Sequence, residues 1–190
     1  MLRSLLAITA LLLAAHLLDG PALALRLDGL GGSDGHRALR VAGFLPVWMA
    51  IGAALALHRR QASIGIGLLL SAGLSGLLAE LGKLLIRRAR PSASEAYAFL
   101  PLPPDLSTAG LGMPSSHAAV AFGGAFLLAR LYPRVAPVVV LWAAGCGLTR
   151  ILDGAHFLSD VVAAAALAWL IARALAPRIQ AKIRQPSTPD

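Results

Sequence analysis

Residues 62–86 read ASIGIGLLLSAGLSGLLAELGKLLI, an apolar run of 25 residues with only two charged side chains, Glu80 and Lys83. A bilayer hydrocarbon core about 30 Å thick is crossed by about 20 predominantly apolar residues in one helix. The run is therefore long enough to cross a membrane as a single helix. It predicts a helical, membrane-embedded protein for which lipid is the main solvent.

Apolar runs also occupy much of the remaining chain. They cover five further segments, approximately 4–18, 41–57, 115–131, 135–152 and 158–175. Of the 190 residues, 57% are hydrophobic and 14% are charged, whereas a soluble domain has about 45–50% apolar and about 25% charged residues. We expect an all-α integral membrane bundle of six transmembrane helices in residues 1–176, followed by a disordered, polar cytoplasmic tail, 177–190.

The first run also fits a second interpretation. Arg3, the apolar stretch after it and the small residues Ala22-Leu23-Ala24 resemble a cleavable signal peptide. Retention of the segment is favoured, because its removal leaves an odd number of helices and puts the charge pattern out of step. The sequence leaves this choice open.

The chain carries a formal net charge of +8, from 17 Lys and Arg against 9 Asp and Glu. Such a charge is typical of proteins that bind nucleic acid, but here the basic residues stand at the ends of apolar runs, where they set membrane topology. Aromatic residues make up only 5% of the chain, too few for a base-stacking surface. We expect the bilayer, and no nucleic acid, as a partner.

Orientation is only weakly encoded in the basic residues. With a cytoplasmic N-terminus and alternating helices, nine of them fall inside and eight outside, a small difference for the positive-inside rule. If some outer cations belong to a functional site, the remaining charges favour this orientation more clearly. We then expect a bacterial inner membrane protein with its site on the periplasmic side.

Two polar connections join the apolar runs. The longer, 87–113, contains several prolines and must lie outside the hydrocarbon, where irregular backbone would leave polar groups unpaired. The other, 19–40, is predicted to carry no chemistry. Its Asp28, Asp34 and His36 are interpreted as flexible surface polarity rather than as a metal site.

A basic cluster, KLLIRRARP at residues 83–91, ends the 62–86 helix. The spacing predicts that Lys83, Arg87 and Arg90 lie near one helical face, and Pro91 helps to end the helix. Cations on one face repel one another unless an anion lies between them. The competing interpretation is a membrane-stop cluster whose side chains snorkel to the interface.

A second cluster, Met113-Pro114-Ser115-Ser116-His117, leads directly into the 115–131 run. Proline and serine are typical of a helix start, where a hydroxyl caps a free amide. Capping explains the serines but not His117, which falls in the first turn, where free amides favour an anion such as phosphate. A histidine beside that anion can donate a proton to a leaving oxygen.

The third cluster, TRILDGAHFLSD at residues 149–160, lies between the last two runs. The spacing of His156 and Asp160 predicts that they share a helix face, so that the carboxylate bonds one ring nitrogen and leaves the other as nucleophile or base. Gly154 allows the turn that brings Arg150 over the histidine. Taken alone, such a pair is more often a structural hydrogen bond.

The predicted topology puts all three clusters on the outer face of the membrane. Their ordered pattern, Lys-x6-Arg-Pro, Pro-Ser-x-His and Arg-x5-His-x3-Asp, resembles the signature of the type 2 phosphatidic acid phosphatase superfamily, membrane lipid phosphatases with a six-helix layout. The resemblance spans residues 83–160. Each part alone is weak, whereas the ordered set is a strong signal.

The resemblance implies a role for each matching residue. His156 is the nucleophile that forms a phosphohistidine, Asp160 orients it, and His117 protonates the leaving oxygen and then activates water. The phosphate is held by cationic and hydroxyl side chains with nearby amides: Lys83, Arg90, Ser115, Ser116 and Arg150. No metal or other cofactor is implied, because the cations stabilise the transferring phosphoryl group.

Two positions depart from the family pattern. Ser116 stands where glycine is typical, and Thr149 stands where serine is typical. Neither change removes a catalytic group. We expect both to affect substrate preference more than activity.

The resulting hypothesis is an integral membrane phosphatase that acts on a lipid phosphate monoester or diphosphate. Polyprenyl diphosphate (undecaprenyl diphosphate), phosphatidate and phosphatidylglycerophosphate are favoured as substrates. A lipid A phosphatase or a phosphotransferase needs the same residues, and both alternatives stay open. A transporter is disfavoured because the charges gather at one membrane face instead of midplane, and an inactive scaffold because the catalytic residues are intact.

Overall fold

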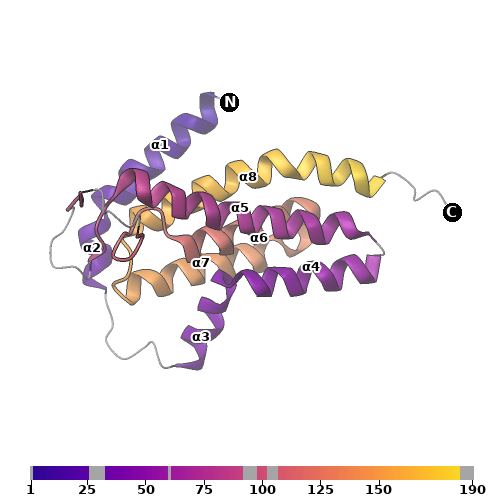
Figure 1. The fold of residues 1–190 in the computed structure, drawn as a ribbon, viewed down its shortest axis with the longest axis horizontal. Helices are drawn as coiled ribbons and strands as arrows, with labels where there is room; N and C mark the ends of the chain where they lie inside the picture. The colour runs from indigo at the N-terminus through magenta and orange to yellow at the C-terminus, as the bar shows by residue number, and fades with distance from the viewer. Residues whose placement is uncertain (1, 26–32, 60, 92–97, 102–106, 185–190) are drawn as a thin grey trace.

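The computed structural model describes residues 2–25, 33–59, 61–91, 98–101 and 107–184. Its helices, drawn in Figure 1, are α1 (Leu2–Leu17), α2 (Asp19–Ala24), α3 (Asp34–Arg40), η2 (Val41–Gly43), α4 (Leu45–Arg59), α5 (Ala62–Ile86), α6 (Ser116–Leu131), η4 (Pro133–Val135), α7 (Ala136–Leu152) and α8 (Leu158–Arg184). In these ranges, extended pairing is limited to isolated antiparallel bridges, Arg88 with Phe99 and Ala89 with Leu111. The predicted all-α class is confirmed.

The described helices support three or four membrane spans. Segments 62–86, 133–152 and 158–184 are long and apolar enough to cross a bilayer. A fourth span results if 34–43 and 45–59, which meet at 74°, are one broken helix. α1 and α6 are apolar but have 16 residues each, which at about 1.5 Å per residue falls short of a core about 30 Å thick. Six spans therefore stay a prediction.

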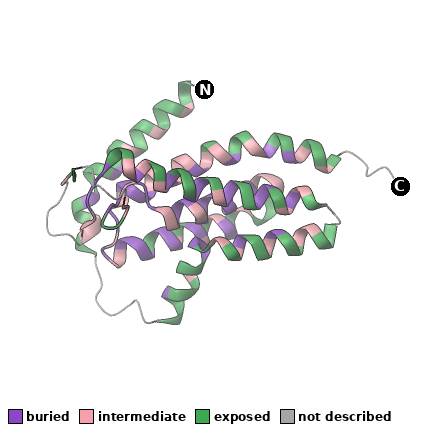
Figure 2. Ribbon diagram, viewed as in Figure 1, coloured by how far each residue is buried: buried purple, intermediate pink, exposed green. Residues whose placement is uncertain are grey.

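α6 lies at the centre of the bundle, where it packs against α5, α7 and α8. Figure 2 shows that its residues are largely buried, whereas α1 and α4 expose much of their surface. Small residues permit the close approach: Ser71 Oγ of α5 donates to Gly123 O of α6 at 2.6 Å, and Gly124 lies against the indole of Trp48. Small residues serve the same purpose at other helix interfaces in membranes.

The last helix is longer than predicted. α8 continues through Pro177 to Arg184, so the disorder predicted from residue 177 is wrong for 177–184, while 185–190 lie outside the described residues. Contacts with other elements hold the helix beyond the proline, which alone would weaken it. They are the packing of Ile179 on Gly67, a hydrogen bond from Gln180 Nε2 to Arg130 O at 3.0 Å, and one from Gln61 Nε2 to Ile183 O at 3.1 Å.

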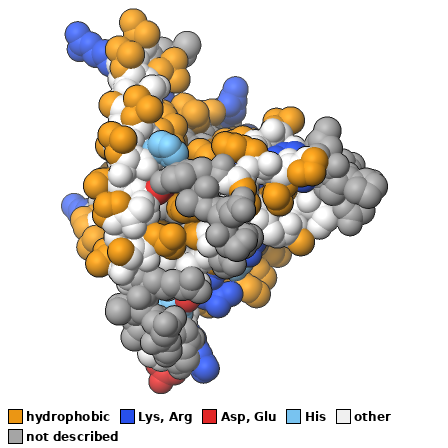
Figure 3. Space-filling view, turned by 90° about the vertical axis from the view of Figure 1, so that its left-hand side faces the viewer, with side chains coloured by type: hydrophobic (Ala, Val, Ile, Leu, Met, Phe, Trp, Pro, Cys, Tyr) orange, Lys and Arg blue, Asp and Glu red, His pale blue; other side chains and the backbone are white. Residues whose placement is uncertain are grey.

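Four helix ends meet at one end of the bundle, on the left of Figure 1. They are the C-terminal ends of α5 and α7 and the N-terminal ends of α6 and α8, and the α1–α2 corner lies beside them. Figure 3 views the molecule onto this end, where charged side chains and histidine interrupt a largely hydrophobic surface. The antiparallel course of the helices thus brings the three sequence clusters to the same end.

Candidate active site

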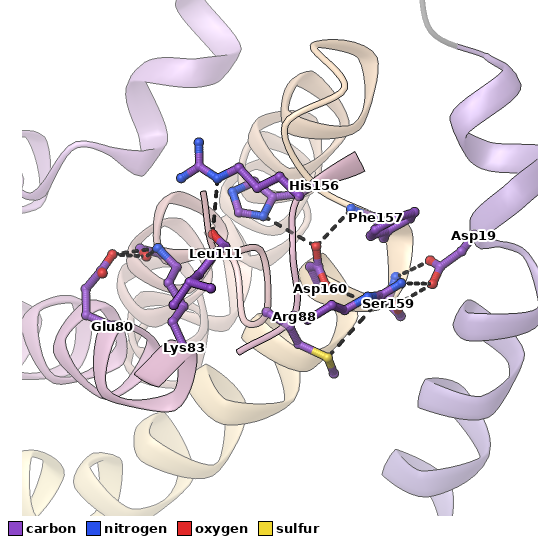
Figure 4. Close-up of polar contacts among 12 residues, drawn as sticks. Asp19, Glu80, Lys83, Arg88, Leu111, His156, Phe157, Ser159 and Asp160 are labelled. Atoms are coloured by element: carbon purple, nitrogen blue, oxygen red, sulfur yellow. Dashed lines mark hydrogen bonds and ion pairs between the residues drawn. The ribbon is translucent and has the colours of Figure 1, made fainter. Parts of the chain in front are cut away.

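Lys83 lies in the last turn of α5 and is buried. Its Nζ donates hydrogen bonds to Glu80 Oε1 at 2.7 Å and to Ser116 Oγ at 2.5 Å. Ser116 Oγ in turn donates to Glu80 Oε1. This triangle, with Glu80 and Lys83 labelled in Figure 4, joins the first cluster to the second. It also introduces Glu80, a carboxylate absent from the predicted phosphate site.

The chain leaves the α5 helix at Arg87, whose φ of 57° is left-handed. Lys83 is therefore on the helix, whereas Arg87 and Arg90 follow it, and the predicted common helical face is wrong. Arg87 donates to two carbonyl oxygens of the following loop, Leu100 O at 3.0 Å and Pro101 O. The Arg87 guanidinium thus binds backbone carbonyl oxygens and does not join Lys83 and Arg90 in a shared anion site.

α6 begins at Ser116, with His117 in the first turn, as predicted. Ser115 lies at the N-cap position, but its hydroxyl does not cap a free amide as the sequence predicted. Ser115 N donates to Asp160 O at 3.1 Å, which ties this helix start to α8. Ser115 Oγ is fully buried and has no hydrogen-bond partner among the described residues. An unpaired buried hydroxyl is costly, so this atom is suited to a ligand oxygen, as are the free amides beside it.

The turn between α7 and α8 is made by Gly154, whose φ is 62°. The amides of Ala155 and His156 both donate to Arg150 O, at 3.1 and 3.2 Å, and hold the end of α7 next to the histidine, as predicted. Arg150 Nη1 donates to Asp153 Oδ2 at 2.8 Å. Arg150 Nε is buried with no partner in the described ranges, so the guanidinium retains donor capacity for an anion.

His156 and Asp160 are close to each other, but they do not share a helix face. α8 begins at Leu158, so His156 precedes the helix. His156 Nδ1 lies 3.5 Å from Asp160 Oδ2, and that oxygen accepts a hydrogen bond from Phe157 N at 2.9 Å. The predicted pair is present with a different local geometry, because the carboxylate reaches back over the helix start. Since Nδ1 faces the carboxylate, Nε2 is the nitrogen left for chemistry (Figure 4).

Burial lowers the pKa of His156 below its ordinary value of 6.5. Asp160 opposes this shift, and the positive charges of Arg150 and Arg90 add to it. The imidazole is therefore neutral at neutral pH. Neutral imidazole carries the lone pair that a nucleophile requires.

The two histidines share one electrostatic environment. The charges of Arg150, Lys83 and His156 act on His117, and Arg90, half-buried, holds its place through a hydrogen bond from Nε to Leu111 O at 3.1 Å. The structure thus brings together the predicted site residues, which are Lys83, Arg90, Ser115, Ser116, His117, Arg150, His156 and Asp160.

Behind this cluster, Asp160 takes part in ion pairs that the sequence patterns did not indicate. Arg88 contacts both Asp160 and Asp19, which are fully buried, and Ser159 joins them. Asp19, at the start of segment 19–40, therefore belongs to a buried network of ion pairs. The spacing predicts a pair of Asp19 with His16, and His16 Nδ1 does lie 3.4 Å from Asp19 Oδ2. A carboxylate at the end of an apolar run needs a partner, but nothing in the sequence indicates Arg88.

The interpretation of His36 as flexible surface polarity is also wrong. The side chain is buried, and its Nε2 lies 3.0 Å from Asp153 Oδ1, so it docks α3 on the end of α7. Asp34 is exposed as predicted, whereas Asp28 lies outside the described residues. His36 thus supports the turn that carries Arg150.

Known proteins resemble this chain in sequence. Residues 64–184 match the PAP2 superfamily. The chain is 38% identical over 110 residues to a lipid A 1-phosphatase of Rhizobium johnstonii, and 29% identical over 128 residues to an undecaprenyl-diphosphatase of Sulfolobus acidocaldarius. These matches cover 56% and 66% of this chain but 44% and 58% of the relatives. The chain thus spans about half the length of the curated relatives it matches.

A solved structure resembles the chain over nearly its whole length. It is the crystal structure of a PAP2-type phosphatidylglycerolphosphate phosphatase from Bacillus subtilis, with a TM-score of 0.65 and 22% identity, covering 98% of this chain and 96% of that one. At this identity the likeness shows a common transmembrane fold. The match at 64–184 covers more than half of the chain and contains the three clusters. The chain therefore belongs to the PAP2 superfamily.

Proposed function

We propose that this protein is a membrane lipid phosphatase that hydrolyses a phosphate monoester or diphosphate through a phosphohistidine on His156. The observation that carries the proposal is the convergence of a buried, carboxylate-oriented histidine, a second histidine at a helix start, and several cations at one end of the bundle. Family membership supports the same reaction class.

In the first step, Nε2 of His156 attacks phosphorus. The N–P bond forms as the bond between phosphorus and the leaving oxygen breaks; this oxygen is the ester oxygen of a monoester or the bridging oxygen of a diphosphate. His117, whose protonated form the bound anionic phosphate stabilises, gives its proton to the departing oxygen. Lys83, Arg90 and Arg150 stabilise the charge on the equatorial oxygens. Asp160 stabilises the positive charge that develops on the imidazole.

In the second step, water attacks the phosphohistidine. His117, now neutral, takes a proton from the water as its oxygen bonds to phosphorus, and the N–P bond breaks. Inorganic phosphate leaves, and both histidines return to their starting states. One water is consumed for each phosphate released, so no other reactant is needed.

The proposed membrane arrangement has six crossings, made by α1, the bent α3–α4 unit, α5, α6, α7 and α8. The site lies at the outer, periplasmic face of a bacterial inner membrane. The opposite end supports this orientation, because basic residues gather where the inside is expected. They are Arg59, Arg130, Arg134, Arg178, Lys182 and Arg184.

For the substrate we propose a lipid phosphate with a large hydrophobic anchor. The relatives named for lipid A 1-phosphate and undecaprenyl diphosphate favour these two lipids, the former at higher identity. Both are accessible to a site at the membrane edge without leaving the bilayer. Phosphatidylglycerophosphate and phosphatidate complete the group to be compared.

The test is phosphate release by the purified protein in mixed micelles from these four lipids, with a chelator present. We expect release from at least one lipid, its loss by about 1,000-fold or more in His156→Ala, and a strong loss in His117→Ala, because both steps need the proton that His117 carries. His58→Ala, an exposed histidine at the other end of the bundle, is the control and should retain activity. Release from none of the lipids, or normal activity of His156→Ala, contradicts the proposal.

A further inference from the structure

Arg88 is buried, with 3% of its surface exposed, and lies between two fully buried carboxylates. Its Nη1 donates to Asp160 Oδ1 at 3.1 Å and to Ser159 Oγ at 2.6 Å, while Nη2 donates to Asp19 Oδ2 at 2.9 Å. The guanidinium also stacks over the Phe157 ring, 4.0 Å from its centre. Figure 4 shows the resulting order of groups, with Arg88 between Asp19 and Asp160 and His156 beyond Asp160.

Asp19 reaches this network from the corner between α1 and α2, outside the segment that matches the family. Its Oδ1 accepts from Ser159 N at 2.8 Å, and its Oδ2 accepts from Ser159 Oγ at 2.6 Å. The carboxylate therefore sits at the N-terminal end of α8, where the helix dipole favours negative charge. It fixes the start of the helix that carries Asp160.

The division of the guanidinium between two acids has a geometric consequence. An Arg fork facing one carboxylate tends to bind both of its oxygens. Here Nη2 of Arg88 binds Asp19, so only Nη1 is available for Asp160, and it contacts Oδ1 alone. Oδ2 is left for Phe157 N and for His156.

The charges of Arg88, Asp19 and Asp160 also favour the interaction of Asp160 with His156. Arg88 is shared between two carboxylates, and His16 Nδ1 also lies 3.4 Å from Asp19 Oδ2. The shared guanidinium offsets the charge of Asp160 only in part, so Asp160 keeps its attraction for the imidazolium that forms when His156 bonds to phosphorus. A single buried Arg–Asp pair would be neutral and would offer less stabilisation. Both arguments give Asp19 a role in catalysis at a distance from the substrate.

We propose that Arg88 and Asp19 are positioning residues that orient the Asp160 carboxylate toward the nucleophile His156; this inference rests on the proposed function. The first apolar run then contributes to catalysis, because it places Asp19 beside Arg88. Because Asp19 lies within the segment that resembles a signal peptide, the working enzyme must retain that segment.

The experiment compares Arg88→Lys and Asp19→Asn with matched controls. Lys keeps the charge but reaches only one carboxylate, and Asn keeps the shape of Asp19 but loses its charge. Arg87→Lys is the control for the first, because Arg87 is similarly buried but bonds backbone carbonyls. Asp34→Asn, at an exposed position, is the control for the second.

The measurements are kcat and KM for dioctanoyl phosphatidate in mixed micelles and inhibition by inorganic phosphate. Should phosphatidate not be turned over, the lipid of the panel that is hydrolysed fastest replaces it. We expect kcat to fall by about 100-fold in Arg88→Lys and Asp19→Asn, the size of effect that a misplaced catalytic group produces. KM and the phosphate Ki should stay within about threefold, because the phosphate ligands are untouched. The two controls should keep wild-type kcat.

A double variant, Asp19→Asn/Arg88→Met, separates positioning from folding. Removing Arg88 alone leaves two buried carboxylates without their cation, whereas removing the charge of Asp19 as well leaves only Asp160 in that state. We expect its melting temperature in detergent to lie above that of Arg88→Met, while kcat stays low because no donor from Arg88 holds Oδ1 of Asp160. A well-folded Arg88 or Asp19 variant with wild-type kcat overturns the proposal, as does a loss of kcat that matches the Arg87→Lys control.

Failure of the proposed function gives a different result. In that case the wild-type protein itself hydrolyses none of the lipids. The ring 15N signals of His156 then test the positioning directly. They should change in Asp19→Asn and not in Asp34→Asn, and unchanged signals overturn the inference.

Discussion

Glu80 places a carboxylate among the groups that we propose hold the substrate phosphate. Its side chain is 40% exposed and accepts from both Lys83 and Ser116. Ser116 is also the position where the resemblance leads one to expect glycine, so the hydroxyl that engages Glu80 is a departure from the family pattern. A phosphate that binds Lys83 must therefore compete with an internal anion.

Replacement of Glu80 should reveal this competition. Glu80→Gln removes the negative charge and leaves a side chain of the same size, so Lys83 is released for the ligand. We expect the Ki for inorganic phosphate to fall by about three- to tenfold, as the loss of a partly exposed like charge allows. The effect should shrink at high salt because such charges are screened.

Ser116→Ala provides the control for the Glu80 prediction. It removes the hydroxyl but leaves Glu80 paired with Lys83, so the Ki should not fall. An unchanged or higher Ki in Glu80→Gln contradicts the interpretation that Glu80 competes with the ligand.

At the scale of elements, α6 connects the catalytic end to the core. It begins with the proposed phosphate site and then packs on α5, α7 and α8. Gly124, in its second half, lies directly against the buried indole of Trp48, which donates from Nε1 to Ala42 O at 2.7 Å. The α4–α6 contact therefore has no room for a side chain at position 124.

Two glycine substitutions in membrane helices should have opposite effects. Gly124→Ala forces a methyl group against Trp48 and should lower the melting temperature in detergent, since overpacking costs about 1–3 kcal/mol. In Gly73→Ala, no atom lies within 4 Å of the added carbon, and the gain in helix propensity of about 1 kcal/mol should leave the melting temperature unchanged or raised. Equal melting temperatures for the two variants would contradict the packing described for α6.

At the scale of the whole molecule, the proposed site residues and the basic residues that indicate membrane orientation lie at opposite ends of the bundle. The proposed catalytic cluster lies where α5, α6, α7 and α8 meet (Figure 1). The basic residues at the opposite end, in the α4–α5 and α6–α7 connections and at the end of α8, have no proposed catalytic role. The proposed site cations explain why the raw count of basic residues is almost even between the two sides. Once they are set aside, the remaining charges favour an outward-facing site.

Labelling of introduced cysteines tests this orientation. Ala109→Cys lies at the site end and Val135→Cys at the opposite end, and both positions are exposed. The native Cys146 is buried. In intact bacterial spheroplasts, a membrane-impermeant maleimide should modify Ala109→Cys and spare Val135→Cys until the membrane is opened. The reverse pattern would put the site on the cytoplasmic side.

Local properties of the chain were predictable from the sequence. Apolar length predicted the helical membrane class and the extent of α5, and the turn residue Gly154 predicted the reversal after Arg150. The spacing of the three clusters indicated which residues would gather at one end. These features depend on near neighbours along the chain, where hydrophobic length, turn chemistry and periodicity act directly.

Where a helix ends and which buried groups pair were decided by tertiary structure. Arg87 ends α5 in a left-handed conformation, and α8 continues through Pro177 because α5 and α6 hold it. The contact of Arg88 with Asp19 joins positions 69 residues apart. A buried charge must find its partner wherever the fold provides one, and such a pairing leaves no periodic trace in the sequence.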